Sequence, residues 1–204
     1  DLTWSSSDDS VVRVDSITGQ ITGRAKGTAK ITVTTVDGSY TDSCVVEVIQ
    51  LATGVSLSFS SISLDAGKNK TIGATVSPTS ATDRTVTWMS SNEKVAPVTA
   101  DGTVKAISAG TATITATSTD GAASATCKVT VKQPATKVKL SSTTLKVAVG
   151  GKSTLKATLE PANVTNKEIT WSSANKSIAT VSSSGVVKGV KAGKVKITAT
   201  SGDG

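Results

Sequence analysis

One pattern of residues occurs three times along this chain, and the recurrence limits what the chain can fold into. The second copy reads "VTWMSSNEKVAPVTADGTVKAISAGTATITAT", and similar strings open the chain and return near its end. The tryptophans Trp4, Trp88 and Trp171 mark the copies at separations of 84 and 83 residues. Solenoid repeats are shorter, roughly 20–45 residues, and do not fold alone. The period therefore predicts a row of small separate domains.

Alternating apolar and polar residues predict strands in every copy. In "GTATITATS" Ile114 and two alanines alternate with threonines, and in "SATCKVTVK" Val129 and its apolar neighbours alternate with polar residues. The pair Asp120-Gly121 between these segments is typical of a hairpin turn, so the two strands should be antiparallel neighbours. No segment has a sustained 3.6-residue period. We predict an all-β fold of short strands, about seven to a unit, as in a β-sandwich.

The core of each unit has to be aliphatic, because aromatic residues make up only 2% of the chain. Each Trp falls in the third strand of its unit, where sandwiches of this kind place a core Trp, so a core role is favoured over a sugar-binding platform. The residues that we expect to be buried are Trp88, Trp171, Ile72, Ile114, Val129, Leu155 and Ile197.

These residues carry a resemblance to a known family. The run Trp-x-Ser-Ser, then Val-Ala-x-Val, a turn ending in Gly, Ala-Gly-Thr-Ala-Thr-Ile-Thr-Ala-Thr and a last Val-Thr-Val strand resembles the bacterial immunoglobulin-like domain of group 2. The resemblance implies tandem immunoglobulin-like β-sandwiches. It also implies an extracellular module of bacterial surface proteins, adhesins, secreted wall or polysaccharide enzymes, or phage virion proteins. Because one fold serves many functions, the resemblance does not choose among these.

The same alignment divides the chain into three repeats. Repeat one (residues 1–50) lacks its first two strands, repeat two (51–132) is complete, and repeat three (133–204) lacks its last strand. Both chain ends fall inside repeats, so we expect a segment of a longer array. The junctions near residues 50–53 and 133–136 are short, which predicts an elongated rod. The incomplete repeats should expose sheet edges and apolar faces, and should be the least ordered parts of the chain unless strands from a neighbour fill the gap.

Little in the sequence points to catalysis or metal binding. The chain has no His, which removes the commonest general base, the usual catalytic triads and the commonest metal ligand. Asp37, Asp101 and Asp120 each precede a glycine, so we interpret them as turn residues and not as calcium ligands. No glycine-rich loop precedes a helix. We predict no catalytic residue, no cofactor and no metal site, and that the chain is not an enzyme.

The two cysteines occupy one position in two repeats. Cys44 and Cys127 are 83 residues apart, one repeat period. A disulfide needs Cα atoms within about 7 Å, and equivalent points in successive sandwiches lie farther apart. We interpret both as small buried hydrophobic residues on the last strand. The alternative is an intermolecular bridge.

The positive charge belongs to repeat three. Up to Lys132 the chain has 11 basic and 12 acidic residues, and from Gln133 onward it has 11 and 3. Lys139, Lys156 and Lys188 should point outward from the first, second and fifth strands, which share one sheet in an immunoglobulin-like sandwich. Such a stripe would attract a polyanion such as teichoic acid or a sulfated glycan. Nucleic acid is not expected, since no aromatic residue is interleaved for bases to stack on. The alternative is that the lysines keep outer strands soluble and block edge pairing.

Two hypotheses about function follow. The leading one is a non-catalytic extracellular spacer module of a bacterial cell-surface or secreted protein, which displays a functional head. Its partners are then the neighbouring immunoglobulin-like domains of the same chain, with no membrane insertion within this segment. The alternative is an adhesion module that binds an anionic or carbohydrate partner such as a cell-wall or host glycan, or a decoration domain of a phage virion protein.

Overall fold

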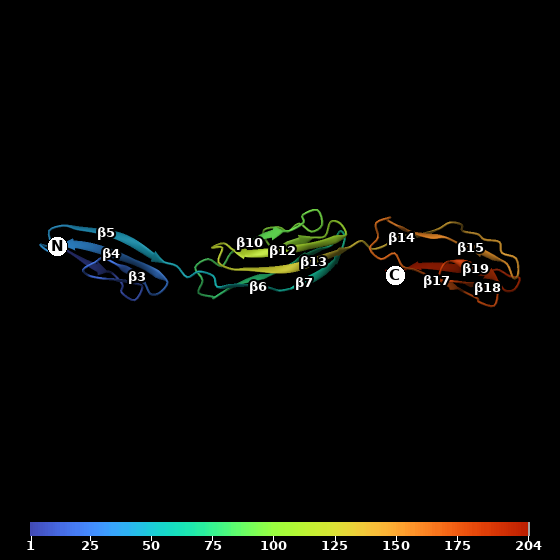
Figure 1. Cartoon of the computed structure of the whole chain (residues 1–204), viewed down its shortest axis with the longest axis horizontal. Helices are drawn as coiled ribbons and strands as arrows, with labels where there is room; N and C mark the ends of the chain where they lie inside the picture. The colour runs from blue at the N-terminus through green and yellow to red at the C-terminus, as the bar shows by residue number, and fades with distance from the viewer. Residues whose placement is uncertain (204) are drawn as a thin grey trace. The chain divides into compact units, whose positions relative to one another are not determined.

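The computed structural model describes residues 1–203, and its regular structure within that range consists of twenty strands (Figure 1). The prediction of an all-β fold is confirmed. Among the residues described, no helix is long and apolar enough to cross a membrane.

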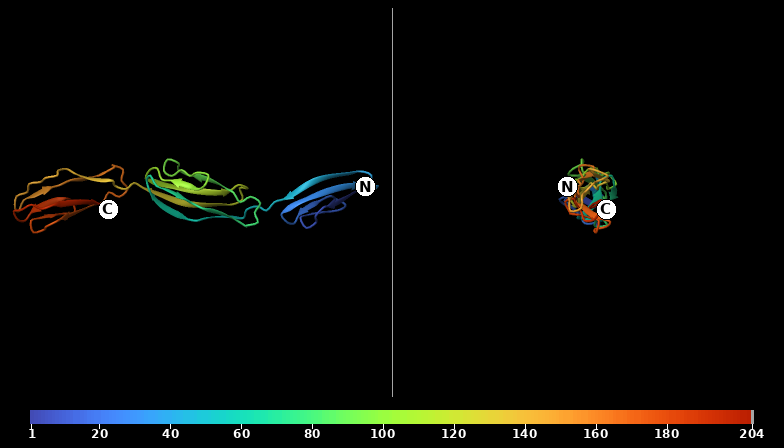
Figure 2. Two further views of the ribbon diagram at one scale, coloured as in Figure 1. Left: turned by 180° about the vertical axis from the view of Figure 1, so that it is seen from behind. Right: turned by 90° about the vertical axis from the view of Figure 1, so that its right-hand side faces the viewer.

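Every hydrogen-bonded sheet within residues 1–203 joins strands from a single repeat. Each repeat therefore has its own set of hydrogen-bonded sheets. Within each repeat the longer strands run along the repeat's own long direction (Figures 1 and 2).

Repeat two has the largest sheet. Its strands are β6 (Gly54–Leu57), β7 (Ser61–Asp65), β8 (Asn69–Thr71), β9 (Ala74–Ser77), β10 (Val86–Ser90), β11 (Thr103–Lys105), β12 (Gly110–Ser118) and β13 (Ser124–Lys132). One sheet has the order β10-β12-β13-β7, and two further ladders pair β6 with β9 and β11 with β8. As predicted, β12 and β13 are neighbours joined by a tight turn, in which the Ser118 N–H donates to the Ala123 carbonyl at 2.8 Å. The strand β13 also pairs with β7, in parallel.

The predicted core of repeat two is confirmed at its three aliphatic residues. Ile114 and Val129 are 0% exposed and Ile72 is 1% exposed. Apolar residues alternate along β12 and β13 because successive side chains of a strand point to opposite faces of the sheet. The face that they share is the interior of the sandwich.

Repeat one is built from fewer strands. They are β1 (Leu2–Ser6), β2 (Val12–Val14), β3 (Ile21–Gly23), β4 (Gly27–Thr35) and β5 (Thr41–Val48). One sheet has the order β1-β4-β5, and β2 pairs with β3. The small core is formed by Val12, Ala29 and Ile31.

Repeat three has short ladders. Its strands are β14 (Lys137–Leu140), β15 (Lys152–Thr154), β16 (Ala157–Glu160), β17 (Ile169–Ser173), β18 (Ala179–Val181), β19 (Val186–Gly189) and β20 (Ile197–Ser201). The sheets are β14-β16, β15-β19-β18 and β17-β20. Leu155, Ala179 and Val187 form the core, which confirms the prediction for Leu155.

Equivalent positions differ in burial where a covering strand is absent. Ile197 is only half-buried, although its counterpart Ile114 is fully buried, so the prediction that Ile197 is buried was wrong. Likewise Ile21 on β3 is 46% exposed, whereas its counterpart Val104 on β11 is 0% exposed. In repeat two, β13 lies beside β12 and β8 pairs with β11. Among residues 1–203, repeat three has no counterpart of β13 and repeat one has none of β8.

The tryptophans are half-buried, which corrects the prediction that Trp88 and Trp171 are buried. The rings of Trp4 and Trp171 lie against a glycine turn. A Cβ atom on Gly19 would come within 2.6 Å of the Trp4 ring, and one on Gly185 within 2.9 Å of the Trp171 ring. Both glycines have positive φ, +72° and +78°. Each ring also packs against the core of its own repeat, and the rest of its surface remains in solvent.

Candidate functional site

The described residues contain no group of three or more Cys, Asp or Glu side chains able to hold a metal ion, and the chain has no His. Several carboxylates instead serve the turns. Asp37 accepts hydrogen bonds from the Thr35 hydroxyl and, at 3.0 Å, from the Ser39 N–H. Asp101 accepts in the same way from the hydroxyls of Thr99 and Thr103 and from the Thr103 N–H. The interpretation of these aspartates as turn residues is confirmed.

Asp120 has a further contact that the sequence did not suggest. Its Oδ1 accepts from the Ser118 hydroxyl at 2.5 Å and from the Ala122 N–H at 3.1 Å, while Oδ2 accepts from the Ala52 N–H at 2.6 Å. These hydrogen bonds, the Ser118 hydroxyl first, hold the pKa of the Asp120 carboxyl below its usual value. Repeat three has the same contact, from the Ala135 N–H to Asp203 at 2.9 Å. The aspartate thus fastens the hairpin turn to the beginning of its own repeat.

The cysteines differ in environment. Cys127 is buried, as predicted, and burial raises the pKa of its thiol. Cys44 is exposed, so the prediction for that residue was wrong. Both residues lie at one position of the last strand, but Cys127 belongs to a strand flanked by β12 and β7, whereas β5 in repeat one is flanked by β4 alone in the described part of the chain.

The lysines Lys139, Lys156 and Lys188 are all exposed, but they do not lie in one ladder. Lys139 is on β14, opposite Thr158 of β16. Lys188 is on β19 in the separate sheet β15-β19-β18, where it lies opposite Lys152. Lys156 falls at the break between β15 and β16, and its carbonyl accepts from the Ser141 N–H at 2.8 Å. The expectation of a single shared sheet is therefore corrected, because the second strand is interrupted at residues 155–156.

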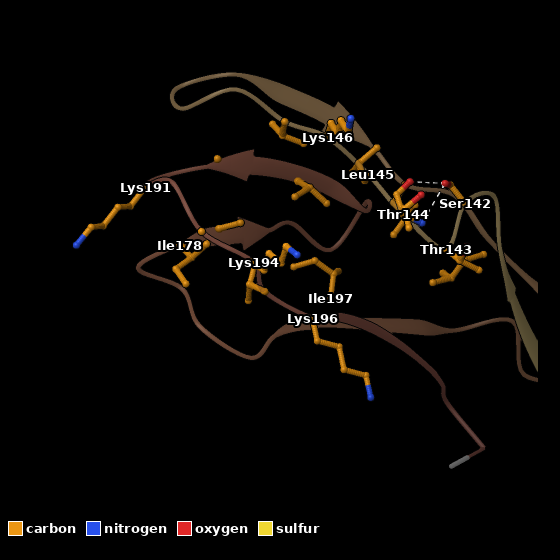
Figure 3. A pocket seen from close by; sticks show the side chains of 18 residues that line it. Ser142, Thr143, Thr144, Leu145, Lys146, Ile178, Lys191, Lys194, Lys196 and Ile197 are labelled. Atoms are coloured by element: carbon orange, nitrogen blue, oxygen red, sulfur yellow. Dashed lines mark hydrogen bonds between the residues drawn. The ribbon is translucent and has the colours of Figure 1, made fainter.

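A groove lies beside β20 in repeat three, with a cavity volume of about 580 Å³ (Figure 3). We name it the β20 groove. One wall is residues 142–147, the other is residues 193–197, and core residues such as Leu155 and Val187 form its floor. Four lysines line it, namely Lys146, Lys191, Lys194 and Lys196. The side chains of Lys191 and Lys196 point outward from the groove (Figure 3).

Comparison with known proteins places the chain in a family. The model of the bacterial Ig-like domain (group 2) matches residues 1–46, 51–129 and 134–204. An Ig-like virion protein of Serratia phage KSP90 is 39% identical over 143 residues, which are 68% of this chain and 55% of the phage protein. An uncharacterised protein of Clostridium acetobutylicum is 34% identical over 155 residues, 76% of this chain and 16% of that protein. The chain thus spans only part of each relative.

Shorter and more distant matches were also found. An alpha-L-arabinofuranosidase of Bifidobacterium longum is 56% identical over 59 residues, which are 29% of this chain and 6% of the enzyme. Domains 1–6 of the surface layer protein SbsC cover 99% of this chain, with 24% identity and a TM-score of 0.35, and the match spans 33% of that structure. The family match extends over all three repeats, so this chain belongs to the bacterial Ig-like domain family, group 2, and is a tandem array of immunoglobulin-like β-sandwiches.

Proposed function

We propose that this chain is a non-catalytic structural module of an extracellular protein, and that its three repeats space or display a functional part located elsewhere. The observation that carries the proposal is that each repeat has its own sheets and its own buried core. The side chains that stand out chemically, the aspartates of the turns, are engaged in holding local structure.

The relatives support a modular role. The matched regions occupy 55% of a phage virion protein and 6% of an arabinofuranosidase. Repeats of one kind therefore accompany different functional parts, as a spacer would. A cell surface, a secreted protein and a virion are all extracellular settings that suit such a module.

The experiment measures length in solution. Small-angle scattering of the chain should give an elongated particle, with junctions near residues 50–53 and 133–136. Deleting residues 51–132 should shorten the maximum dimension by about 30 Å, since β12 has nine residues and a strand rises ~3.4 Å per residue. A near-spherical particle, or a dimension unchanged by the deletion, would contradict the spacer role.

A second candidate function is adhesion to a polyanion through repeat three, with cell-wall or host glycans as the partner class. It is favoured by the exposure of Lys139, Lys156 and Lys188 and by the position of Lys152 directly opposite Lys188. Like charges at close range repel each other, and a bound anion would relieve that repulsion. The alternative role of these lysines is to keep the strands soluble.

Binding to heparin or teichoic acid across a salt series tests adhesion. Binding at low salt should weaken when Lys139, Lys156 and Lys188 are all changed to Gln, and should weaken as salt increases. The matched control changes three lysines of repeat two, Lys68, Lys94 and Lys105, to Gln. No binding at low salt, or equal loss in the control, would leave only the solubility role.

A further inference from the structure

Three hydrogen-bond donors stand side by side on the sheet β15-β19-β18 of repeat three. Lys188 on β19 lies directly opposite Lys152 on β15 and directly opposite Thr180 on β18. Residues directly opposite each other in a ladder share a face of the sheet, so the three side chains project together. The face is the outer one, because both lysines are exposed while Val187 and Gly189 beside Lys188 are buried. We name these three residues the lysine row.

The lysine row contains no carboxylate. Opposite residues in a ladder have Cβ atoms about 4.5–5.5 Å apart, and like charges at that separation destabilise the sheet. The carboxylates of repeat three are Glu160, Glu168 and Asp203. Glu160 lies opposite Lys137 at the beginning of β14, and Asp203 accepts a hydrogen bond from the Ala135 N–H.

These carboxylates are at the other end of the repeat from the lysine row. Glu168 lies with them, since its carbonyl accepts from the N–H of Gly202, the residue before Asp203. The strands β15 and β19 lie towards the end of the repeat that is farther from residue 133 (Figure 1). Exposed charges separated by more than about 10 Å are largely screened at 0.1 M salt. The two lysines therefore repel each other without a carboxylate nearby to offset the repulsion.

Repeat two does not have this row. The counterpart of Lys188 is Lys105, which lies opposite Asn69 and whose N–H donates to the Pro97 carbonyl on its other side. Asp101 is in the turn that leads into β11. The counterparts of Asn69, Pro97 and Asp101 in repeat three are Lys152, Thr180 and Ser184. Each of the three changes adds a donor beside the shared lysine or removes a negative charge, and each favours an anion.

The sheet that carries the row is separate from the sheet that carries the last strand of a repeat. In repeat two, β13 lies between β12 and β7, whereas the strands that correspond to β15 and β19 are β8 and β11, in a ladder of their own. The lysine row is thus formed by β15, β19 and β18 alone.

The donors of the row fit an anion with three terminal oxygens. Each ammonium group and the hydroxyl can donate to a separate oxygen. A sulfate ester presents three such oxygens, whereas a carboxylate or the phosphodiester of teichoic acid presents two. Neighbouring strands are about 4.8 Å apart, so the row spans roughly 10 Å between its outer Cα atoms. The flexible stems of both lysines bridge that distance, and hydrogen bonds from ammonium groups to an anion are stronger than neutral ones.

We propose that the lysine row binds one sulfate ester group of a sulfated glycan. Lys152 and Lys188 neutralise the charge of the group, and the Thr180 hydroxyl donates to its third oxygen. The inference rests on the adhesion function proposed above for repeat three, and it names the anionic group and the residues that select it. Lys139 and Lys156 then strengthen attraction to any polyanion without distinguishing sulfate from carboxylate.

Binding of the whole chain to two matched polymers tests the inference. The probes are dextran sulfate and carboxymethyl dextran of equal charge per sugar, which differ only in the anionic group. At low salt the chain should bind dextran sulfate about fivefold more tightly, which is the net contribution of one hydrogen bond. Hydrogen exchange should slow in β15 and β19 when dextran sulfate binds, because bound ligand stabilises the strands that hold it.

Variants separate the lysine row from general charge. Thr180→Val removes the third donor without changing charge, and it should abolish the preference for sulfate while binding persists. Lys152→Asn should abolish the preference too, and adding Asn69→Lys to that variant, which restores the formal charge of +7, should not recover it. Lys139→Ser removes one charge outside the row and should leave the preference intact.

The outcomes distinguish this inference from the adhesion function on which it rests. Equal affinity of the parent chain for both polymers would overturn the sulfate site and leave adhesion standing. A preference that survives Thr180→Val, or that Lys139→Ser removes equally, would overturn the assignment to the lysine row. Absence of binding to either polymer at low salt would refute adhesion itself and the sulfate site with it.

Discussion

Replacing the equivalent isoleucine by alanine in two different repeats would measure how much a covering strand contributes to the stability of a repeat. Ile114 and Ile197 occupy the same position on β12 and β20, but Ile114 is 0% exposed and Ile197 is half-buried. Replacing a fully buried isoleucine by alanine costs about 2–5 kcal/mol, and the cost rises with the cavity that remains. For Ile114→Ala, between β10 and β13 in a four-stranded sheet, we expect about 4 kcal/mol. For Ile197→Ala, with roughly half of the burial, we expect about 2 kcal/mol.

Hydrogen exchange read by mass spectrometry reports each repeat separately within the whole chain. A loss of 1.4 kcal/mol in the free energy of unfolding speeds exchange of the slowest amides about tenfold. The exchange rate of these amides should therefore rise roughly a thousandfold in repeat two for Ile114→Ala and roughly thirtyfold in repeat three for Ile197→Ala. Thr113→Ala, an exposed position on β12, serves as the control and should change little. If Ile197→Ala destabilised its repeat as much as Ile114→Ala does, the claim that the absence of a strand leaves Ile197 partly uncovered would be wrong.

Three further predictions concern glycine, cysteine and aspartate. Gly185→Ala should destabilise the chain by about 2 kcal/mol more than Gly121→Ala in urea denaturation, although both glycines have positive φ. A Cβ on Gly185 would overlap the Leu155 carbonyl oxygen, whereas a Cβ on Gly121 would meet nothing within 4 Å. Cys44 should react with a maleimide in the folded chain and Cys127 only after denaturation, since one is exposed and the other buried; equal rates, measured by mass spectrometry, would contradict this. Asp120→Asn should lower the melting temperature at pH 7. The pKa of the Asp120 carboxyl in the folded chain lies below 3.8, so the ionised carboxylate stabilises the fold above pH 3.8. This stabilisation is lost as the pH falls through the folded pKa, and the difference in melting temperature between the variant and the parent chain should then vanish.

The part of the fold that sequence could predict is the part set by local periodicity. Alternation along "GTATITATS" places Ile114 inward whatever the rest of the chain does, and the Asp120-Gly121 turn joins the two strands that flank it. Burial is different, because it depends on strands that come from elsewhere. Cys44 alternates correctly and is nevertheless exposed, since its repeat has no counterpart of β7 within the described residues.

The candidate sites also combine features that can be counted in the sequence with features that depend on distant strands. The excess of lysine in repeat three could be counted from sequence, but the partition of Lys139 and Lys188 into two ladders depends on the break at residues 155–156. The groove lysines Lys146 and Lys194 were not singled out. A comparison of the repeats position by position would have found them, because serine and threonine of repeat two become lysine there. What sequence does not show is that both belong to the walls of one cavity.

The charge of the β20 groove does not follow merely from the absence of a strand. An uncovered edge alone needs only solubility, which a lysine at any outward position supplies. The groove lysines instead lie on both walls.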